Sequence, residues 1–146
     1  MPERPPRILF VCVENSCRSQ MAEGFARALS QGRLEASSAG SRPSGRVDPR
    51  AIASMKERGV DLTKQRPKGL EDLPAGVIWD CIVTMGCGDS CPHLEAKTRL
   101  NWELPDPRTM SDEEFHRVRD EIECLVRNLL ELVGRSTVRE GRAGEG

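Results

Sequence analysis

Residues 8–19 read ILFVCVENSCRS and contain three structural signals in succession. Ile8 to Val13 is a continuous apolar run of strand-forming residues, typical of a central parallel strand that is buried on both faces. A helical pattern opens at about Ser19, whose hydroxyl can cap that helix. The stretch therefore predicts a strand, a tight loop and a helix.

The loop between these two elements has the composition of an oxyanion site. A loop that enters a helix in this way directs several backbone N–H groups at one point, and the helix dipole adds positive potential there. The planar guanidinium of Arg18 can bind two oxygens of one anion, and Asn15 tolerates a left-handed backbone. We expect a tetrahedral oxyanion to be bound by residues Val13, Glu14, Asn15, Ser16, Cys17 and Arg18.

Cys12 stands at the start of this loop and Arg18 at its end, in a C-x5-R spacing. Backbone dipoles and a guanidinium around a thiol favour the thiolate, which is the reactive form. The Ser19 hydroxyl is placed to donate a hydrogen bond to that thiolate. We interpret Cys12 as a nucleophile under a bound oxyanion, and Cys17 as a small buried thiol without a separate role.

Strand and helix patterns alternate along the rest of the chain, and the last helix has a capping box formed by Ser111 and Glu114. This alternation predicts an α/β fold with a doubly wound four-stranded parallel sheet, flanked by helices and with its site at the carboxyl ends of the strands. The further strands are expected at 34–39, 77–85 and 98–102, the helices at 19–32, 49–58 and 111–133, and the last apolar stripe at Phe115, Val118, Ile122, Leu125, Leu129 and Leu132.

Length and composition limit the class of protein. The 146 residues fit one domain, expected over residues 1–134, with the charged, glycine-rich residues 135–146 as a flexible tail. A net charge of −1 favours neither a nucleic-acid partner nor an anionic membrane surface. The apolar runs are too short for a membrane span or a signal peptide. We therefore expect a cytoplasmic, reduced monomer without cofactor or bound metal.

Two further features carry possible chemistry. Cys87 and Cys91 form a C-x3-C pair in a glycine-containing loop, where they could be resolving thiols or, with His93, part of a zinc site that lacks a clear fourth ligand. Asp106 lies between two prolines on a stiff loop, where its carboxyl could protonate a leaving oxygen or simply be an exposed turn residue. Cys81 is expected in the core, and Cys124 on the surface.

Five motifs together point to a known family: CVENSCRSQMAEGFA, SAG at residues 38–40, DPRAIASMKERGVDL, IVTMGCGDSCP, and NWELPDP followed by EEFHRVRDEI. They resemble the thioredoxin-coupled arsenate reductases, which share the fold of the low-molecular-weight protein tyrosine phosphatases, over residues 7 to about 133. The phosphatases line their site with aromatic residues, typically a tyrosine beside the acid. This chain has no tyrosine, and Arg108 follows Asp106-Pro107.

The resemblance implies a relay of three thiols. Cys12 would attack arsenate, and Asp106 would protonate the departing oxygen. Cys87 would then attack Cys12 and release arsenite, and Cys91 would attack Cys87. Thioredoxin, or a glutaredoxin with a low-molecular-weight thiol, would reduce the resulting disulfide. Two thiols that form one disulfide supply the two electrons that As(V) needs.

The chain departs from the family pattern in two places. Only three residues separate Cys87 from Cys91, so these two cysteines could exchange roles. Some members bind potassium, and this chain has Lys68 near the position of one acidic ligand, so its ammonium could replace the ion. The other potassium ligands match Asn15, Glu23 and Ser38.

Two alternative functions remain open. A low-molecular-weight phosphomonoesterase or protein tyrosine phosphatase would use Cys12, Arg18 and Asp106 and leave Cys87 and Cys91 idle. A redox- or metal-responsive binding module would have no turnover at all.

Overall fold

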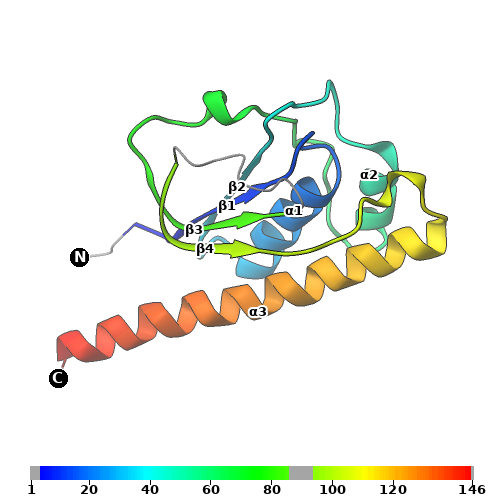
Figure 1. The fold of residues 1–146 in the computed structure, drawn as a ribbon. Coiled ribbons are helices and arrows are strands. Elements are labelled where there is room, and N and C mark those ends of the chain that lie inside the picture. Colours follow the sequence, from blue (N-terminus) through cyan, green and yellow to red (C-terminus); the bar gives the residue numbers. More distant parts are fainter. Residues whose placement is uncertain (1–3, 86–93, 146) are drawn as a thin grey trace.

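The structure is a computed structural model that describes residues 4–85 and 94–145, with the backbone alone at Arg108 and from residue 134 onward. Over these residues four parallel strands form one sheet in the order β2-β1-β3-β4 (Figure 1). The predicted four-stranded parallel α/β sheet is therefore confirmed. The strands are β1 Arg7–Val11, β2 Glu35–Ala39, β3 Ile78–Thr84 and β4 Glu95–Asn101.

β4 begins three residues earlier than the sequence predicts. Its first half, Glu95 to Lys97, is mostly exposed and lacks the apolar pattern of a buried strand. Pairing with β3 nevertheless extends back to Glu95, which lies opposite Ile78. Backbone pairing with β3, rather than burial, defines this end of the strand.

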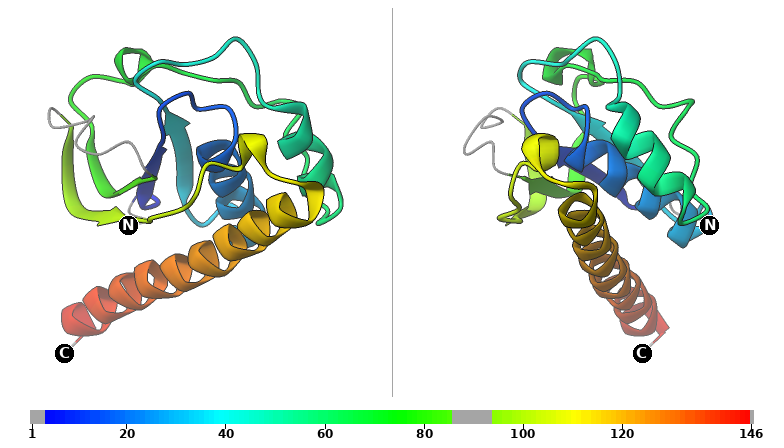
Figure 2. Two further views of the ribbon diagram at one scale, coloured as in Figure 1. Left: turned by 45° about the vertical axis from the view of Figure 1, so that its right-hand side comes forward. Right: turned by 90° about the vertical axis from the view of Figure 1, so that its right-hand side faces the viewer.

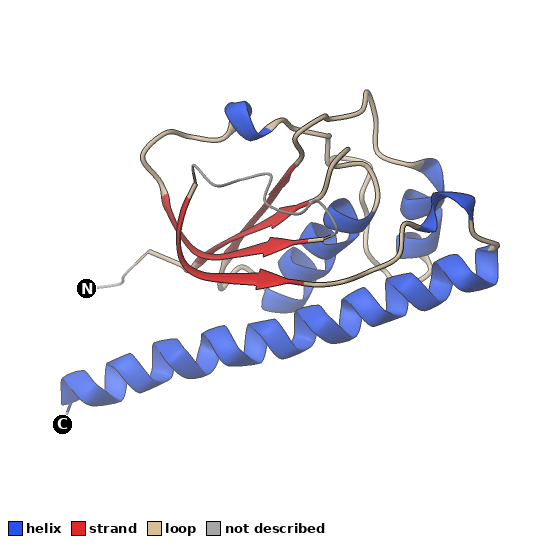
Figure 3. Cartoon of the chain, viewed as in Figure 1, coloured by secondary structure: helices blue, strands red, loops and turns tan. Residues whose placement is uncertain are grey.

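Three α-helices and two short 3-10 helices complete the described chain. Figure 3 shows the α-helices gathered on one side of the sheet, and the two turned views of Figure 2 show α3 as one long rod that extends past the body of the domain. The helices are α1 Arg18–Ser30, α2 Pro49–Lys56 and α3 Asp112–Glu145, and the 3-10 helices are η1 Leu70–Asp72 and η2 Pro107–Thr109.

The core has two parts, one on each face of the sheet. Ile8 and Phe10 of β1 pack with the α-helices on one face. Leu9 and Val11, which point the opposite way, pack against residues near η1 on the other face. All four side chains are fully buried, as expected for a central parallel strand.

The last helix differs from its prediction at its end and in one core position. The predicted end lay at about Val133, whereas the backbone remains helical to Glu145. Gly134 lowers helix propensity by only about 1 kcal/mol, and no proline follows to interrupt the hydrogen bonds. Leu132, predicted to be inward, is 60% exposed, while Val126 is fully buried, because the buried stripe follows 3.6-residue spacing from Ile122 through Val126 to Leu129. The flexible tail at 135–146 stays a prediction, since helical backbone does not report motion.

The predicted starts of α2 and α3 are confirmed. Asp48 caps α2 by accepting a hydrogen bond from the backbone of Arg50 at 2.8 Å, with Pro49 in the first turn. Ser111 and Glu114 form the reciprocal hydrogen bonds of a capping box before α3. Over the described part of the chain, no helix has both the length and the apolar character needed to cross a bilayer.

Candidate active site

The loop that follows β1 connects it to α1 at the carboxyl end of the sheet (Figure 1). Asn15 has the predicted left-handed backbone, with φ at 51°, and its side chain is fully buried. α1 begins at Arg18, and Cys17 is the capping residue. The predicted capping role of Ser19 is therefore wrong. Ser19 lies inside the first turn, and its hydroxyl faces Cys12 instead of a backbone N–H group.

A buried hydrogen-bonded chain leads to the Cys12 sulfur. The Cys12 Sγ and Ser19 Oγ lie 2.8 Å apart, so the predicted hydrogen bond between them is present. The Asn15 Nδ2 group donates to the same Ser19 oxygen at 2.8 Å. An amide nitrogen can only donate, so Asn15 leaves the Ser19 hydroxyl hydrogen available to the sulfur. This arrangement places a hydroxyl donor within hydrogen-bond distance of the Cys12 sulfur.

The orientation of the Asn15 amide is fixed by its other partners. Its Oδ1 accepts hydrogen bonds from the backbone of Lys68 at 2.7 Å and from the Gln20 side chain at 3.0 Å. Gln20 is itself fully buried, and its Oε1 accepts a hydrogen bond from Gln65. Gln20 and Gln65 were not among the predicted site residues, because a glutamine on a helix or in a loop carries no pattern of its own.

The carbonyl oxygens of the loop point outward. Three of them accept hydrogen bonds of 2.8–2.9 Å from backbone N–H groups of segment 42–48. In a trans peptide the carbonyl and the following N–H point in opposite directions. The N–H groups after these carbonyls therefore point to the inside of the loop, as an oxyanion site requires. They belong to Glu14, Asn15 and Cys17.

Gly40, just beyond β2, lies unusually close to the same loop. A Cβ atom at this position would stand 2.4 Å from the Val13 carbonyl oxygen and 2.5 Å from that of Cys12. Both neighbours are backbone atoms and cannot turn aside. Only glycine therefore allows β2 and the loop to pack at this distance. β1, which leads into the loop, and β2, which leads to Gly40, are parallel neighbours, so their ends meet at one edge of the sheet.

Arg18 and Asp106 both lie at the helix end of the loop. The Arg18 Nη1 group donates to the Leu104 carbonyl at 3.0 Å, at the start of the segment that carries Asp106. Burial raises the pKa of the Cys17 thiol well above its usual range, and the negative charge of Asp106 is among the groups that add to this effect. Asp106 is thus within electrostatic reach of the loop, and Cys17 stays a neutral thiol.

A buried carboxylate, Glu23, lies beside the loop. Ser38 Oγ donates to its Oε1 at 2.5 Å, and the Lys68 ammonium lies 3.6 Å from the same oxygen. Arg27 pairs with its other oxygen at 2.6 Å. Lys68 therefore stands beside two of the residues that match potassium ligands in the resembling family, as the sequence hypothesis requires.

The two cysteines predicted to be resolving thiols, Cys87 and Cys91, lie outside the described residues, as does His93 of the zinc alternative. Within the described part of the chain no three metal-binding side chains gather. Cys81 is buried and Cys124 is exposed, as predicted.

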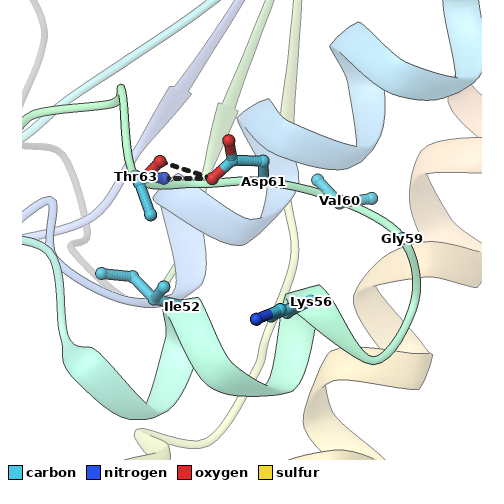
Figure 4. A pocket seen from close by; sticks show the side chains of 6 residues that line it. All are labelled: Ile52, Lys56, Gly59, Val60, Asp61 and Thr63. Atoms are coloured by element: carbon cyan, nitrogen blue, oxygen red, sulfur yellow. Dashed lines mark hydrogen bonds between the residues drawn. The ribbon is translucent and has the colours of Figure 1, made fainter.

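A separate pocket of about 430 Å³ lies against α2 (Figure 4). The Asp61 carboxylate in its wall accepts two hydrogen bonds from Thr63. None of the predicted site residues lines this pocket. Its lining is Ile52, Lys56, Gly59, Val60, Asp61 and Thr63.

Comparison with known proteins identifies the family. The sequence pattern described as low molecular weight phosphotyrosine protein phosphatase matches residues 7–139. A glutaredoxin arsenate reductase from Synechocystis sp. is 39% identical over 127 residues, covering 85% of this chain and 95% of the relative. The chain resembles the solved structure of an arsenate reductase in the phosphate binding state with a TM-score of 0.81 at 38% identity, covering 88% and 98% of the two chains.

A third relative is named for thioredoxin rather than for glutaredoxin. The thioredoxin-dependent arsenate reductase from Corynebacterium glutamicum is 32% identical, with a TM-score of 0.76 over 93% of this chain and 65% of that one. The fold class predicted from the sequence is shared by these structures. The chain therefore belongs to the low molecular weight phosphotyrosine protein phosphatase family, in which it aligns with the arsenate reductases.

Proposed function

We propose that this chain reduces arsenate to arsenite, with Cys12 as the nucleophile and a disulfide as the oxidised product. The contact of Cys12 Sγ with the Ser19 hydroxyl carries the proposal, because it stabilises a thiolate inside a loop whose N–H groups point inward. The relatives named arsenate reductases support the choice of oxyanion. One of them is described in a phosphate binding state, and phosphate has the shape and charge of arsenate.

The first step forms a bond between sulfur and arsenic. The Cys12 thiolate attacks arsenate held by the loop N–H groups and the Arg18 guanidinium. One arsenic–oxygen bond breaks, and the departing oxygen leaves as water after taking a proton from Asp106. Arsenic is still As(V) at this point, so no electrons have yet been transferred.

The second step transfers two electrons. The Cys87 thiolate attacks the Cys12 sulfur and forms a disulfide. The sulfur–arsenic bond breaks, its electron pair stays on arsenic, and arsenite leaves as As(III). Cys91 then attacks Cys87, which frees Cys12 and leaves a Cys87–Cys91 disulfide. The short spacing of Cys87 and Cys91 also permits the reverse order of these two thiols.

A dithiol donor must reduce that disulfide before the next turnover. We propose thioredoxin, which supplies both electrons and becomes a disulfide itself. The relatives include one named for thioredoxin and one named for glutaredoxin, so a glutaredoxin with a low-molecular-weight thiol is the alternative. A relay that starts from reduced thiols also requires a reducing compartment, which we take to be the cytoplasm.

The test is steady-state turnover with each donor system supplied separately. The proposal predicts continuous arsenite formation with thioredoxin, thioredoxin reductase and NADPH, and loss of turnover in Cys87→Ser. Turnover with the glutaredoxin system alone would change the donor but keep the reaction. Steady hydrolysis of an aryl phosphate that is unaffected by Cys87→Ser, without arsenite, would show that the chain is a phosphatase.

A further inference from the structure

The segment 104–110 carries Asp106 and has little regular secondary structure. It leaves the sheet after β4 and includes only the single turn of η2 before α3 begins. Asp106 itself is exposed. A general acid must stand within hydrogen-bond reach of the leaving oxygen, so the position of this segment matters for the first step.

Two arginines hold the segment, one at each end. At its start, Arg18 donates to the Leu104 carbonyl at 3.0 Å. At its end, the Arg50 Nη2 group donates to the Met110 carbonyl at 2.8 Å. Arg18 is already assigned to the oxyanion, whereas the proposed reaction gives no role to Arg50.

The Arg50 side chain is oriented by further contacts, with Asp112 and Phe115. The same Nη2 group lies 3.1 Å from the Asp112 carboxylate, at the start of α3. The guanidinium carbon lies 4.6 Å from the centre of the Phe115 ring, which is 1% exposed. A planar guanidinium can stack on a ring and donate in its own plane at the same time, which an ammonium cannot do.

The backbone of Arg50 connects this contact to the Cys12 loop. Its N–H group donates to the Asp48 carboxylate at 2.8 Å. The Asp48 N–H group in turn donates to the Ser16 carbonyl at 2.8 Å. The first turn of α2 therefore touches the oxyanion loop on one side and, through Arg50, the end of the acid segment on the other.

We propose that Arg50 is a positioning residue that sets the Asp106 carboxyl over the oxyanion loop. This role rests on the proposed function, in which Asp106 protonates the leaving oxygen. Without Arg50 the Met110 carbonyl loses its hydrogen bond to α2, and Asp106 spends less time within reach of the substrate. The substrate-binding groups, which lie in the loop and at Arg18, are unchanged.

The test is a double-mutant cycle between Arg50→Met and Asp106→Asn. Methionine keeps an apolar stem over Phe115 and removes the hydrogen bonds. The readout is the rate of a single turnover of arsenate by the fully reduced protein. We expect about a 100-fold loss in Asp106→Asn and about a tenfold loss in Arg50→Met, since displacing an acid forfeits part of its contribution. The double variant should be about as slow as Asp106→Asn alone.

Three controls separate positioning from a loss of folding. Arg117→Met removes an exposed arginine and its ion pair with Glu113, and should leave the rate unchanged. The affinity of Arg50→Met for inorganic phosphate, measured by calorimetry, should match that of the unaltered protein. Arg50→Lys should not restore the rate, because it cannot stack and donate together.

The outcomes that overturn the positioning role are distinct from failure of the reductase. If the losses of the two single variants multiply, so that the double variant is about 1,000-fold slower in a single turnover, Arg50 acts independently of Asp106. Weakened phosphate binding in Arg50→Met, or an unchanged rate in Asp106→Asn, would overturn it as well. If the unaltered protein forms no arsenite, the reductase proposal fails. The same double-mutant cycle is then measured on hydrolysis of an aryl phosphate, because that reaction also needs a proton on its leaving oxygen. Inactivity toward both substrates would overturn the positioning role too.

Discussion

The Sγ atom of Cys12 and the Oγ atom of Ser19 lie 2.8 Å apart, and both side chains are buried. The Asn15 amide donates to the same hydroxyl oxygen, so the hydroxyl hydrogen is available to donate to the sulfur. One hydrogen bond thus joins the residue after β1 to the first turn of α1. It favours the thiolate that the proposed reaction needs.

Removing this hydroxyl should slow the attack on arsenate. A hydrogen bond to a charged group contributes about 1.5–3 kcal/mol, which corresponds to a loss of roughly 10- to 150-fold in Ser19→Ala if it is made mainly to the thiolate. The single-turnover rate measures the effect. Ser30→Ala is the matched control, because Ser30 is also buried in α1 but bonds the Arg27 carbonyl at the far end. An unchanged rate in Ser19→Ala would remove Ser19 from the site.

Adding one methyl group at Gly40 should damage the loop. The new Cβ would stand 2.4 Å from the Val13 carbonyl oxygen, so either β2 or the loop must move. We expect Gly40→Ala to lose about 1–3 kcal/mol in the free energy of unfolding and most of its phosphate affinity. Gly45→Ala is the control, since nothing lies within 4 Å of a Cβ there. Phosphate binding at full strength in Gly40→Ala would show that the close contact is not required.

Potassium should not activate the unaltered protein. The Lys68 ammonium lies 3.6 Å from the Glu23 carboxylate, where it can serve as the cation. The arsenite-forming rate is therefore expected to be equal in sodium and potassium chloride of the same ionic strength. In Lys68→Met the rate should fall and then rise about twofold or more with potassium, which binds the vacated position. Activation of the unaltered protein by potassium would contradict this role of Lys68.

The ion pair between Glu123 of α3 and Arg58, just after α2, should make the free energy of unfolding depend on pH. Burial raises the pKa of the Glu123 carboxyl, but hydrogen bonds from Arg127 and Arg58 outweigh it, so the pKa lies below its usual range. A carboxyl with a lowered pKa in the folded state stabilises the protein above its unfolded pKa, near 4.3, and this contribution disappears as the pH falls through the folded pKa.

Urea unfolding of Glu123→Gln tests this pair. We expect a loss of about 1–2 kcal/mol at pH 7, because the carboxylate is mostly buried although both arginines are partly exposed. The difference from the unaltered protein should shrink below about pH 4. Glu113→Gln, whose pair with Arg117 is exposed, should behave like the unaltered protein at both pH values. A difference that persists at low pH would indicate packing rather than charge.

Local patterns predicted much of the fold and the centre of the site. The apolar run that forms β1, the left-handed Asn15 and the Ser111–Glu114 box each depend on residues close in the sequence. Each appears in the structure, although β1 ends at Val11 and not at the predicted Val13. The capping role of Ser19 was wrong because α1 already begins at Arg18, so Ser19 lies inside the first turn and its hydroxyl faces Cys12, seven residues away. The end of α3 was wrong because a single glycine is a weak stop.

The supporting contacts could not be predicted, because they join distant segments. Gly40 lies beside the loop only once β2 pairs with β1. Arg50 reaches Met110, sixty residues away in the sequence. The ends of neighbouring parallel strands do meet at one edge, so a glycine directly after the second strand is the one signal that sequence could have offered.

The central claim is that Cys12, Cys87 and Cys91 form a relay, and single-turnover reduction of arsenate by the fully reduced protein tests it most directly. No thiol is added, arsenite is counted, and the disulfides are mapped by mass spectrometry. The relay predicts about one arsenite per chain together with a Cys87–Cys91 disulfide. In Cys91→Ser it predicts that a Cys12–Cys87 disulfide accumulates. Absence of arsenite, with every cysteine still reduced and an aryl phosphate steadily hydrolysed, would contradict it.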